Sequence, residues 1–197
     1  MRSGPVNAMR NLLRALDPRR RAQSRRGGEE LPGVLFVCSG NICRSPTAEA
    51  VFRIIAARAG IADRLRIDSA GTQSHHVGQP PDTRAVRAAK ARGFDMPRRC
   101  ARQATPEDFL RFHWIFAMDR ANLRALNELR PPTFAGSLGL YLDLVPDVTV
   151  RDVPDPYYGG AAGFERLLDL VEPASEALAV KLAQALRDRP GEGPGGP

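Results

Sequence analysis

Residues 34–50 read Val-Leu-Phe-Val-Cys-Ser-Gly-Asn-Ile-Cys-Arg-Ser-Pro-Thr-Ala-Glu-Ala, and this stretch decides how the rest of the chain is interpreted. An apolar, β-type run from Val34 to Val37 brings Cys38 to the start of a short polar loop. Arg44 ends that loop, and Ser45-Pro46 opens a segment with helical periodicity, where proline suits the first turn. The pattern predicts a strand, a loop and a helix start, with a thiol at one end of the loop and an arginine at the other.

Such a loop can hold an anion beside a nucleophile. Its backbone N–H groups point inward, and the dipole of the following helix adds positive potential. Arg44 offers a planar fork to two phosphate oxygens, and the same field favours the reactive thiolate of Cys38. Taken alone, Cys38 could equally be an inert buried thiol. Gly40 and Asn41 tolerate the backbone angles that a tight loop needs, and Ser45 can donate a hydrogen bond to the thiolate. The predicted phosphate-binding loop comprises Ser39, Gly40, Asn41, Ile42, Cys43 and Ser45.

Residues 34–49 resemble the signature loop of the low-molecular-weight protein-tyrosine phosphatases, and the resemblance extends over about residues 33–187. It implies an enzyme that hydrolyses phosphotyrosine and small aryl phosphates through a phosphocysteine intermediate, with no cofactor or metal. The further stretches that carry the resemblance are Asp68-Ser69-Ala70-Gly71-Thr72, Val77-Gly78-Gln79-Pro80-Pro81-Asp82-Thr83-Arg84-Ala85, Ala101-Arg102-Gln103, Ile115-Phe116-Ala117-Met118-Asp119 and Asp155-Pro156-Tyr157-Tyr158-Gly159.

Strand and helix signals alternate along the chain. This alternation predicts a single doubly wound α/β domain, with a four-stranded parallel sheet and helices on both faces. The resemblance implies the strand order 2-1-3-4, and it places the ligand beyond the carboxyl end of the first strand, where Cys38 falls. The predicted strands are 34–38, 65–70, 114–118 and 138–142, and the predicted helices are 46–59, 82–92, 105–111, 120–129 and 162–187.

A phosphate ester needs its leaving oxygen protonated, so a general acid is expected opposite Cys38. The candidates are Asp143, Asp147, Asp152 and Asp155, and charge alone does not choose among them. The resemblance assigns the role to Asp155, with Tyr157 and Tyr158 as one wall of the substrate slot. It implies that Cys38 attacks phosphorus while Asp155 protonates the phenol, and that Asp155 then activates the water that hydrolyses the phosphocysteine.

The resemblance also implies a hydrogen-bonded network behind the loop, formed here by Asn41, Ser45 and Ser69. Arg99 stands where members often carry a histidine, so it is either the fourth member of that network or an exposed basic residue at the rim. His75 stands where many members place a tryptophan on the substrate wall, and a rim contact with substrate is one interpretation of it. The neighbouring histidines at 75–76 have no third ligand and make a poor metal site.

Cysteine content and charge limit the cellular setting. Three cysteines do not make a disulfide framework and fit a reducing cytoplasm, while the resemblance implies a reversible disulfide between Cys38 and Cys43.

The chain carries a net charge of +7, of which residues 1–30 contribute +5 and the remainder +2. We predict a basic, disordered extension over 1–30, the phosphatase domain over 31–187, and a disordered Gly/Pro-rich tail over 188–197.

The expected partners are a phosphotyrosine-containing protein substrate and a cognate tyrosine kinase. The position of the basic charge argues against nucleic acid, because the charge falls in the extension rather than on a folded face. The extension also carries apolar residues at helical spacing, which leaves a weak contact with an anionic membrane surface open. No apolar run is long enough to span a membrane, and no secretory signal is recognisable at the N-terminus.

Three alternative functions share this loop. A protein-arginine phosphatase of the same fold tends to carry threonine where this chain has Ile42. An arsenate reductase needs a resolving cysteine pair downstream of the loop, and only Cys100 follows Cys43. A non-catalytic phosphotyrosine-binding module would lack Cys38 or Asp155, and both are present.

Overall fold

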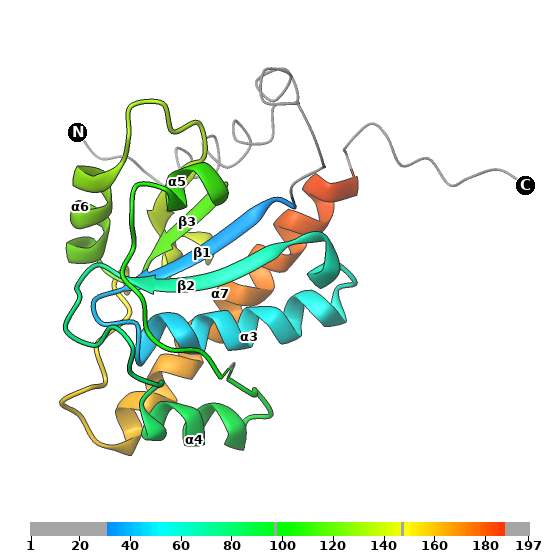
Figure 1. Cartoon of the computed structure of the whole chain (residues 1–197). Helices are drawn as coiled ribbons and strands as arrows, with labels where there is room; N and C mark the ends of the chain where they lie inside the picture. The colour runs from blue at the N-terminus through cyan, green and yellow to red at the C-terminus, as the bar shows by residue number, and fades with distance from the viewer. Residues whose placement is uncertain (1–30, 97, 147, 188–197) are drawn as a thin grey trace, which may run out of the picture.

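The computed structural model describes residues 31–96, 98–146 and 148–187, so the predicted terminal segments 1–30 and 188–197 lie outside the described residues (Figure 1). The described part holds one parallel sheet with the strand order β2-β1-β3-β4, which confirms the predicted α/β class and strand order. The strands are β1 (Gly33–Cys38), β2 (Arg66–Gly71), β3 (Trp114–Ala117) and β4 (Ser137–Leu140).

Helices cover both faces of the sheet, as predicted (Figure 1). The long helices α3 and α7 pack against each other on one face, with α4 beside them, and α5 and α6 lie on the other face. The helices are α3 (Arg44–Arg58), α4 (Thr83–Ala91), α5 (Asp108–Arg111), α6 (Arg120–Leu129) and α7 (Ala161–Arg187), and the short 3₁₀ helices are η1 (Ala62–Arg64) and η2 (Tyr141–Leu144).

Strand β1 is central and completely buried, because it pairs with β2 on one side and β3 on the other. Alternate side chains of β1 enter two hydrophobic cores: Val34 and Phe36 pack with α3 and α7, and Leu35 and Val37 pack with α5 and α6. The carboxyl end of β1 therefore delivers Cys38 to one edge of the sheet from the most firmly held strand of the fold.

Helix α3 begins directly after the loop and shows how the sequence sets its ends. It starts at Arg44, two residues before the predicted start, because Pro46 occupies the first turn, where a missing N–H breaks no helical hydrogen bond. It ends at Arg58, and Gly60, two residues later, has a positive φ of 68°. The amides of Gly60 and Ile61 then satisfy the last carbonyls of the helix, at 3.0 Å from Ala57 O and 2.9 Å from Ala56 O.

Two other predicted boundaries are wrong by two residues or more, while the remaining boundaries shift by one residue or none. The helix expected over 105–111 is shortened to α5, because the Asp108 carboxylate accepts the Thr105 N–H at 2.9 Å and holds the preceding residues in a capping turn. The strand expected over 138–142 ends at Leu140, because the chain turns there into η2. Neither shift alters the edge of the sheet at which the site forms.

Candidate active site

The sulfur of Cys38 lies inside the loop, with hydrogen-bond donors around it. The main-chain N–H of Asn41 donates to Cys38 Sγ at 3.2 Å, and the Ser45 hydroxyl lies 3.0 Å from the same sulfur. Ser45 Oγ also lies 3.1 Å from the carbonyl of Ala70 and accepts from the Asn41 side chain at 2.9 Å. These groups surround the side chain of a cysteine that is only 2 % exposed, so the sulfur is held in a fixed position inside the loop.

Asn41 gives the loop its shape. Its φ is 57°, the left-handed region that asparagine tolerates better than most residues. Its side-chain amide donates to Ser45 Oγ and, at 3.0 Å, to Ser69 Oγ, while its Oδ1 accepts the main-chain N–H of Arg102 at 3.0 Å. Gly71 lets the loop pass close to the end of β2, since a Cβ there would lie 2.6 Å from the carbonyl oxygen of Ser39.

Arg44 is buried, and two carboxylates hold it in place. Its guanidinium donates to Asp119 at 2.6 Å, to Asp155 at 2.6 Å and to Ser39 Oγ at 3.1 Å. Burial lowers the pKa of Arg44, but the negative charges of Cys38 and Asp155 and the contact with Asp119 raise it above its ordinary value. Arg44 therefore remains a cation beside the thiol. Sequence reasoning gave Asp119 no role, although its motif was recognised.

Asp155, the predicted general acid, lies beside the buried guanidinium of Arg44. Asp155 contacts Arg44, and its second oxygen accepts the N–H of Tyr157 at 3.1 Å. The alternative Asp152 pairs instead with Arg120 at 2.8 Å. Asp143 pairs with Arg151, and Asp147 falls outside the described residues.

Of the two tyrosines predicted to form a substrate wall, Tyr157 packs near the loop and Tyr158 is exposed. The ring of Tyr157 is half-buried and lies 5.9 Å from the ring of His76, while Tyr158 is 95 % exposed. His76 also covers Gly40, where a Cβ would come within 2.7 Å of the imidazole. His75 is exposed, so its contact with substrate stays a prediction.

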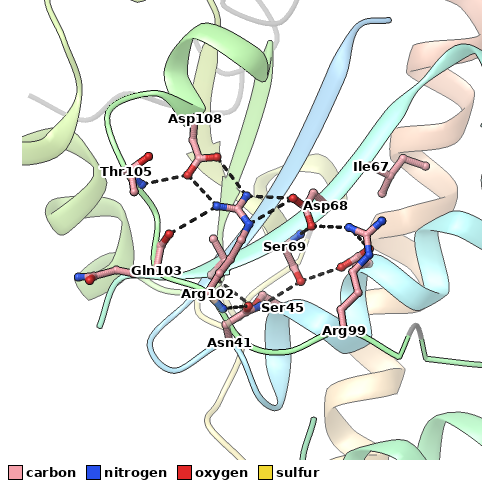
Figure 2. Close-up of polar contacts among 12 residues, drawn as sticks. Asn41, Ser45, Ile67, Asp68, Ser69, Arg99, Arg102, Gln103, Thr105 and Asp108 are labelled. Carbon is pink, nitrogen blue, oxygen red and sulfur yellow. Dashed lines mark hydrogen bonds and ion pairs between the residues drawn. The ribbon is translucent and has the colours of Figure 1, made fainter. Parts of the chain in front are cut away.

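Asn41, Ser45 and Ser69 form a network behind the loop (Figure 2), and a buried carboxylate extends it. Ser69 donates to Glu49 at 2.7 Å, and Glu49 is only 1 % exposed. The Arg99 side chain is 55 % exposed and lies 2.8 Å from Asp68 and 3.8 Å from Glu49. It lines a small cavity with Asn41, Glu49 and Ser69, and it does not line the cleft that contains Arg44. Glu49, which sequence reasoning did not single out, thus extends the hydrogen-bonded network through Ser69. Its burial follows from its place in the first two turns of α3, which are buried from Arg44 to Phe52.

Arg102 ties this network to the neighbouring segments. Figure 2 shows its guanidinium between Asp68 and Asp108, at 3.0 Å from each, while its main chain binds Asn41. Burial lowers the pKa of Arg102, and the two carboxylates raise it above its ordinary value. The side chain thus remains charged and fixes the segment that supports Asn41.

Cys43, the second cysteine of the loop, is buried at the start of α3. Burial, then the charges of Asp82 and Cys38, raise the pKa of the Cys43 thiol to about 12. At neutral pH the Cys43 thiol is therefore protonated.

The site opens into a cleft of about 600 Å³. Within the described part of the chain, no group of three or more histidine, cysteine, aspartate or glutamate side chains is arranged to hold a metal ion. No helix among the described residues is long and apolar enough to cross a membrane. The cleft is lined by Ser39, Arg44, Asp119, Arg120, Ala121, Arg124, Asp152, Val153, Pro154 and Asp155.

Comparison with known proteins places this geometry in a family. The model of the low molecular weight phosphotyrosine protein phosphatase family matches residues 33–188. A low molecular weight protein-tyrosine-phosphatase of Streptomyces coelicolor is 43% identical over 161 residues, which are 79% of this chain and 96% of that protein. A protein tyrosine phosphatase from Entamoeba histolytica superimposes with a TM-score of 0.75 at 39% identity, covering 79% of this chain and 99% of that one. A Drosophila arginine phosphatase gives a TM-score of 0.71 at 30% identity, covering 76% and 96%. The chain belongs to the low molecular weight phosphotyrosine protein phosphatase family.

Proposed function

We propose that this protein hydrolyses phosphotyrosine in proteins through a phosphocysteine formed on Cys38. One observation carries the proposal: the Cys38 sulfur accepts the Asn41 N–H inside a loop that Arg44 closes, and two carboxylates hold Arg44 in place. A fixed cation and inward N–H groups stabilise the charge of a phosphoryl group during transfer. Membership of the phosphatase family supports the same conclusion.

The first step joins Cys38 Sγ to phosphorus. The incoming phosphate takes over the Arg44 N–H that now binds Asp155, and the freed carboxyl group faces the leaving oxygen. The S–P bond forms while the bond from phosphorus to the aryl oxygen breaks, and the proton of Asp155 passes to that oxygen. The tyrosine leaves as a neutral phenol.

The second step restores the thiolate. Asp155, now a carboxylate, takes a proton from water, the water oxygen bonds to phosphorus, and the S–P bond breaks. Phosphate leaves, and Asp155 is again protonated for the next turnover. Throughout both steps Arg44 stays bound to Asp119, 2.6 Å away, so the guanidinium keeps its position when its hydrogen bond to Asp155 is broken.

The aromatic walls favour an aryl phosphate. Tyr157 and the neighbouring His76 offer flat surfaces above the loop on which a phenyl ring can stack. Ile42, in place of the threonine expected of an arginine phosphatase, also supports phosphotyrosine. In the same proposal, Tyr158 and His75 contact the substrate at the rim of the site.

We further infer control by oxidation, with Cys43 capturing an oxidised Cys38 as a disulfide. Cys43 is the other thiol of the loop, and its pKa responds to the charge of Cys38. A free nucleophilic cysteine fits the reducing cytoplasm as the location, with a tyrosine kinase as the enzyme that supplies the phosphotyrosine.

The decisive experiment replaces Cys38 by serine and measures hydrolysis of p-nitrophenyl phosphate at about pH 6. We expect a loss of several orders of magnitude, because the covalent nucleophile is removed. Cys100→Ser is the matched control, since Cys100 is an exposed thiol outside the loop, and it should keep the wild-type rate. Retention of more than about one per cent of activity in Cys38→Ser would overturn the proposal. Faster turnover of phosphoarginine than of phosphotyrosine by the wild type would favour the arginine phosphatase instead.

A further inference from the structure

The cleft does not end at the phosphate-binding loop but continues along the start of α6. Arg44, Arg120 and Arg124 all line it. Arg120 and Arg124 are one helical turn apart, so their side chains share a face of α6. A substrate whose phosphate lies at Arg44 must therefore pass its neighbouring residues along this cationic wall.

The carboxylates of the cleft neutralise only two of these three arginines. Asp119 and Asp155 both bind Arg44, and Asp152 binds Arg120 at 2.8 Å. Within residues 31–96, 98–146 and 148–187, Arg124 forms no ion pair or hydrogen bond. Arg124 is consequently a cation on the cleft wall with no internal carboxylate assigned to it.

We propose that Arg124 binds an anionic side chain beside the phosphotyrosine of the substrate, so that the enzyme prefers phosphotyrosine in an acidic sequence. This inference rests on the proposed function and specifies its substrate class. A guanidinium is a planar donor fork that matches a carboxylate, and it pairs with a second phosphate by the same chemistry. Nucleic acid fits less well, because a phosphate backbone needs several free cations and the cleft carries three carboxylates.

The test compares two phosphotyrosine peptides that differ only in the flanking residues, glutamates in one and glutamines in the other. We expect the wild type to give a kcat/KM about fivefold higher on the glutamate peptide, the effect of one partly exposed ion pair. High salt should reduce the ratio, because screening weakens an exposed pair. A third peptide, with phosphoserine at a flanking position, distinguishes a carboxylate from a second phosphate as the preferred anion.

Three variants make the test specific. Arg124→Gln should bring the ratio close to one, whereas Asp152→Asn should raise it, because Arg120 is then released from its partner. Arg111→Gln is the matched control: Arg111 is an exposed arginine of α5, which leads into the opposite end of β3, and the ratio should stay at the wild-type value (Figure 1).

The proposed subsite would be wrong if Arg124→Gln left the ratio of kcat/KM on the two peptides unchanged, or if it lowered kcat/KM equally on both. Absence of any phosphotyrosine hydrolysis by the wild type would instead overturn the proposed function, so the two failures are distinguishable. A preference for the phosphoserine peptide that Arg124→Gln abolishes would support the subsite and identify phosphate as its anion.

Discussion

Asp119 shows how one side chain can serve both the fold and the chemistry. One of its oxygens accepts the N–H of Asn122 at 2.7 Å and caps the start of α6. The other accepts from Arg44 at 2.6 Å. The helix start and the position of the phosphate-binding cation are therefore fixed by the same carboxylate.

Two substitutions separate these roles. Asp119→Asn should keep the cap, because asparagine caps helices as well as aspartate, yet it should lower kcat/KM by about tenfold by removing a charge-assisted contact to Arg44. Asp119→Ala should lower activity at least as much and also cost about 1 kcal/mol in the free energy of unfolding. Denaturant unfolding and steady-state kinetics on both variants check this. A stable Asp119→Asn with full activity would show that Arg44 needs no second carboxylate.

The protonated thiol of Cys43 makes the proposed disulfide pH-dependent. Because the pKa of Cys43 is raised to about 12, its thiolate fraction near neutral pH is small and grows about tenfold with each unit of pH. After treatment with peroxide, disulfide formation should speed up from about pH 7 to pH 9, and dithiothreitol should restore activity. Mass spectrometry of the trapped species gives the rate.

Cys43→Ser is the control for this prediction. Without the second thiol, oxidised Cys38 should proceed to the sulfinic acid, and dithiothreitol should recover less activity. Equal recovery in the variant and the wild type would remove Cys43 from the mechanism.

At the scale of elements, the loop before α7 positions Asp155, the proposed general acid. Val153 anchors this loop to the end of β3: its N–H donates to Met118 O at 2.7 Å, and its carbonyl accepts from Arg44 at 3.3 Å. The N–H of Gly159 then closes a turn on Pro156 O at 2.9 Å just before α7 begins. Asp155 thus lies between two fixed points and faces Arg44.

Asp155→Asn tests whether this loop supplies the proton. The variant should lose most activity on esters with poor leaving groups and less on activated esters, and its pH–rate profile should lose one limb. Asp152→Asn serves as the matched control, since its carboxylate binds Arg120, and should keep the wild-type dependence on the leaving group. The reverse outcome would move the general acid to Asp152.

At the scale of the whole molecule, the described residues form both hydrophobic cores. All strands and helices that flank the site lie between Gly33 and Arg187, and β1 is buried on both faces by them (Figure 1). The residues assigned to catalysis fall between Cys38 and Asp155. The residues proposed to carry the chemistry therefore lie within the part of the chain that the family model matches.

A chain that begins at Glu30 should accordingly keep kcat and KM on p-nitrophenyl phosphate within about twofold of the full chain, a difference of only ~0.4 kcal/mol. Its melting temperature should also be close to that of the full chain. A tenfold loss of kcat/KM, or a large fall in melting temperature, would show that residues 1–30 take part in the fold.

The sequence allowed prediction of those features of the fold and the site whose residues lie close together along the chain. One continuous stretch of sequence predicts Cys38, Arg44 and the strand-loop-helix order around them. The alternation of strand and helix signals along the chain predicts the parallel sheet. The partners of Arg44 could not be derived that way, because Asp119 is 75 and Asp155 is 111 residues away in sequence. Asp155 was identified only through the resemblance. Glu49 was missed because burial of a carboxylate depends on tertiary neighbours, which periodicity does not reveal.

The bond from the Arg102 main chain to the Asn41 side chain has a consequence for local unfolding. Gly71 N–H donates to Arg102 O, and Ala104 N–H donates to Gly71 O, both at 2.8 Å, so the loop, the end of β2 and residues 101–104 share one set of hydrogen bonds. They should open together as a cooperative unit in native-state hydrogen exchange. The amides of Gly71, Arg102 and Ala104 should exchange with one common free energy, and mild denaturant that opens this unit should abolish activity before the central strand unfolds.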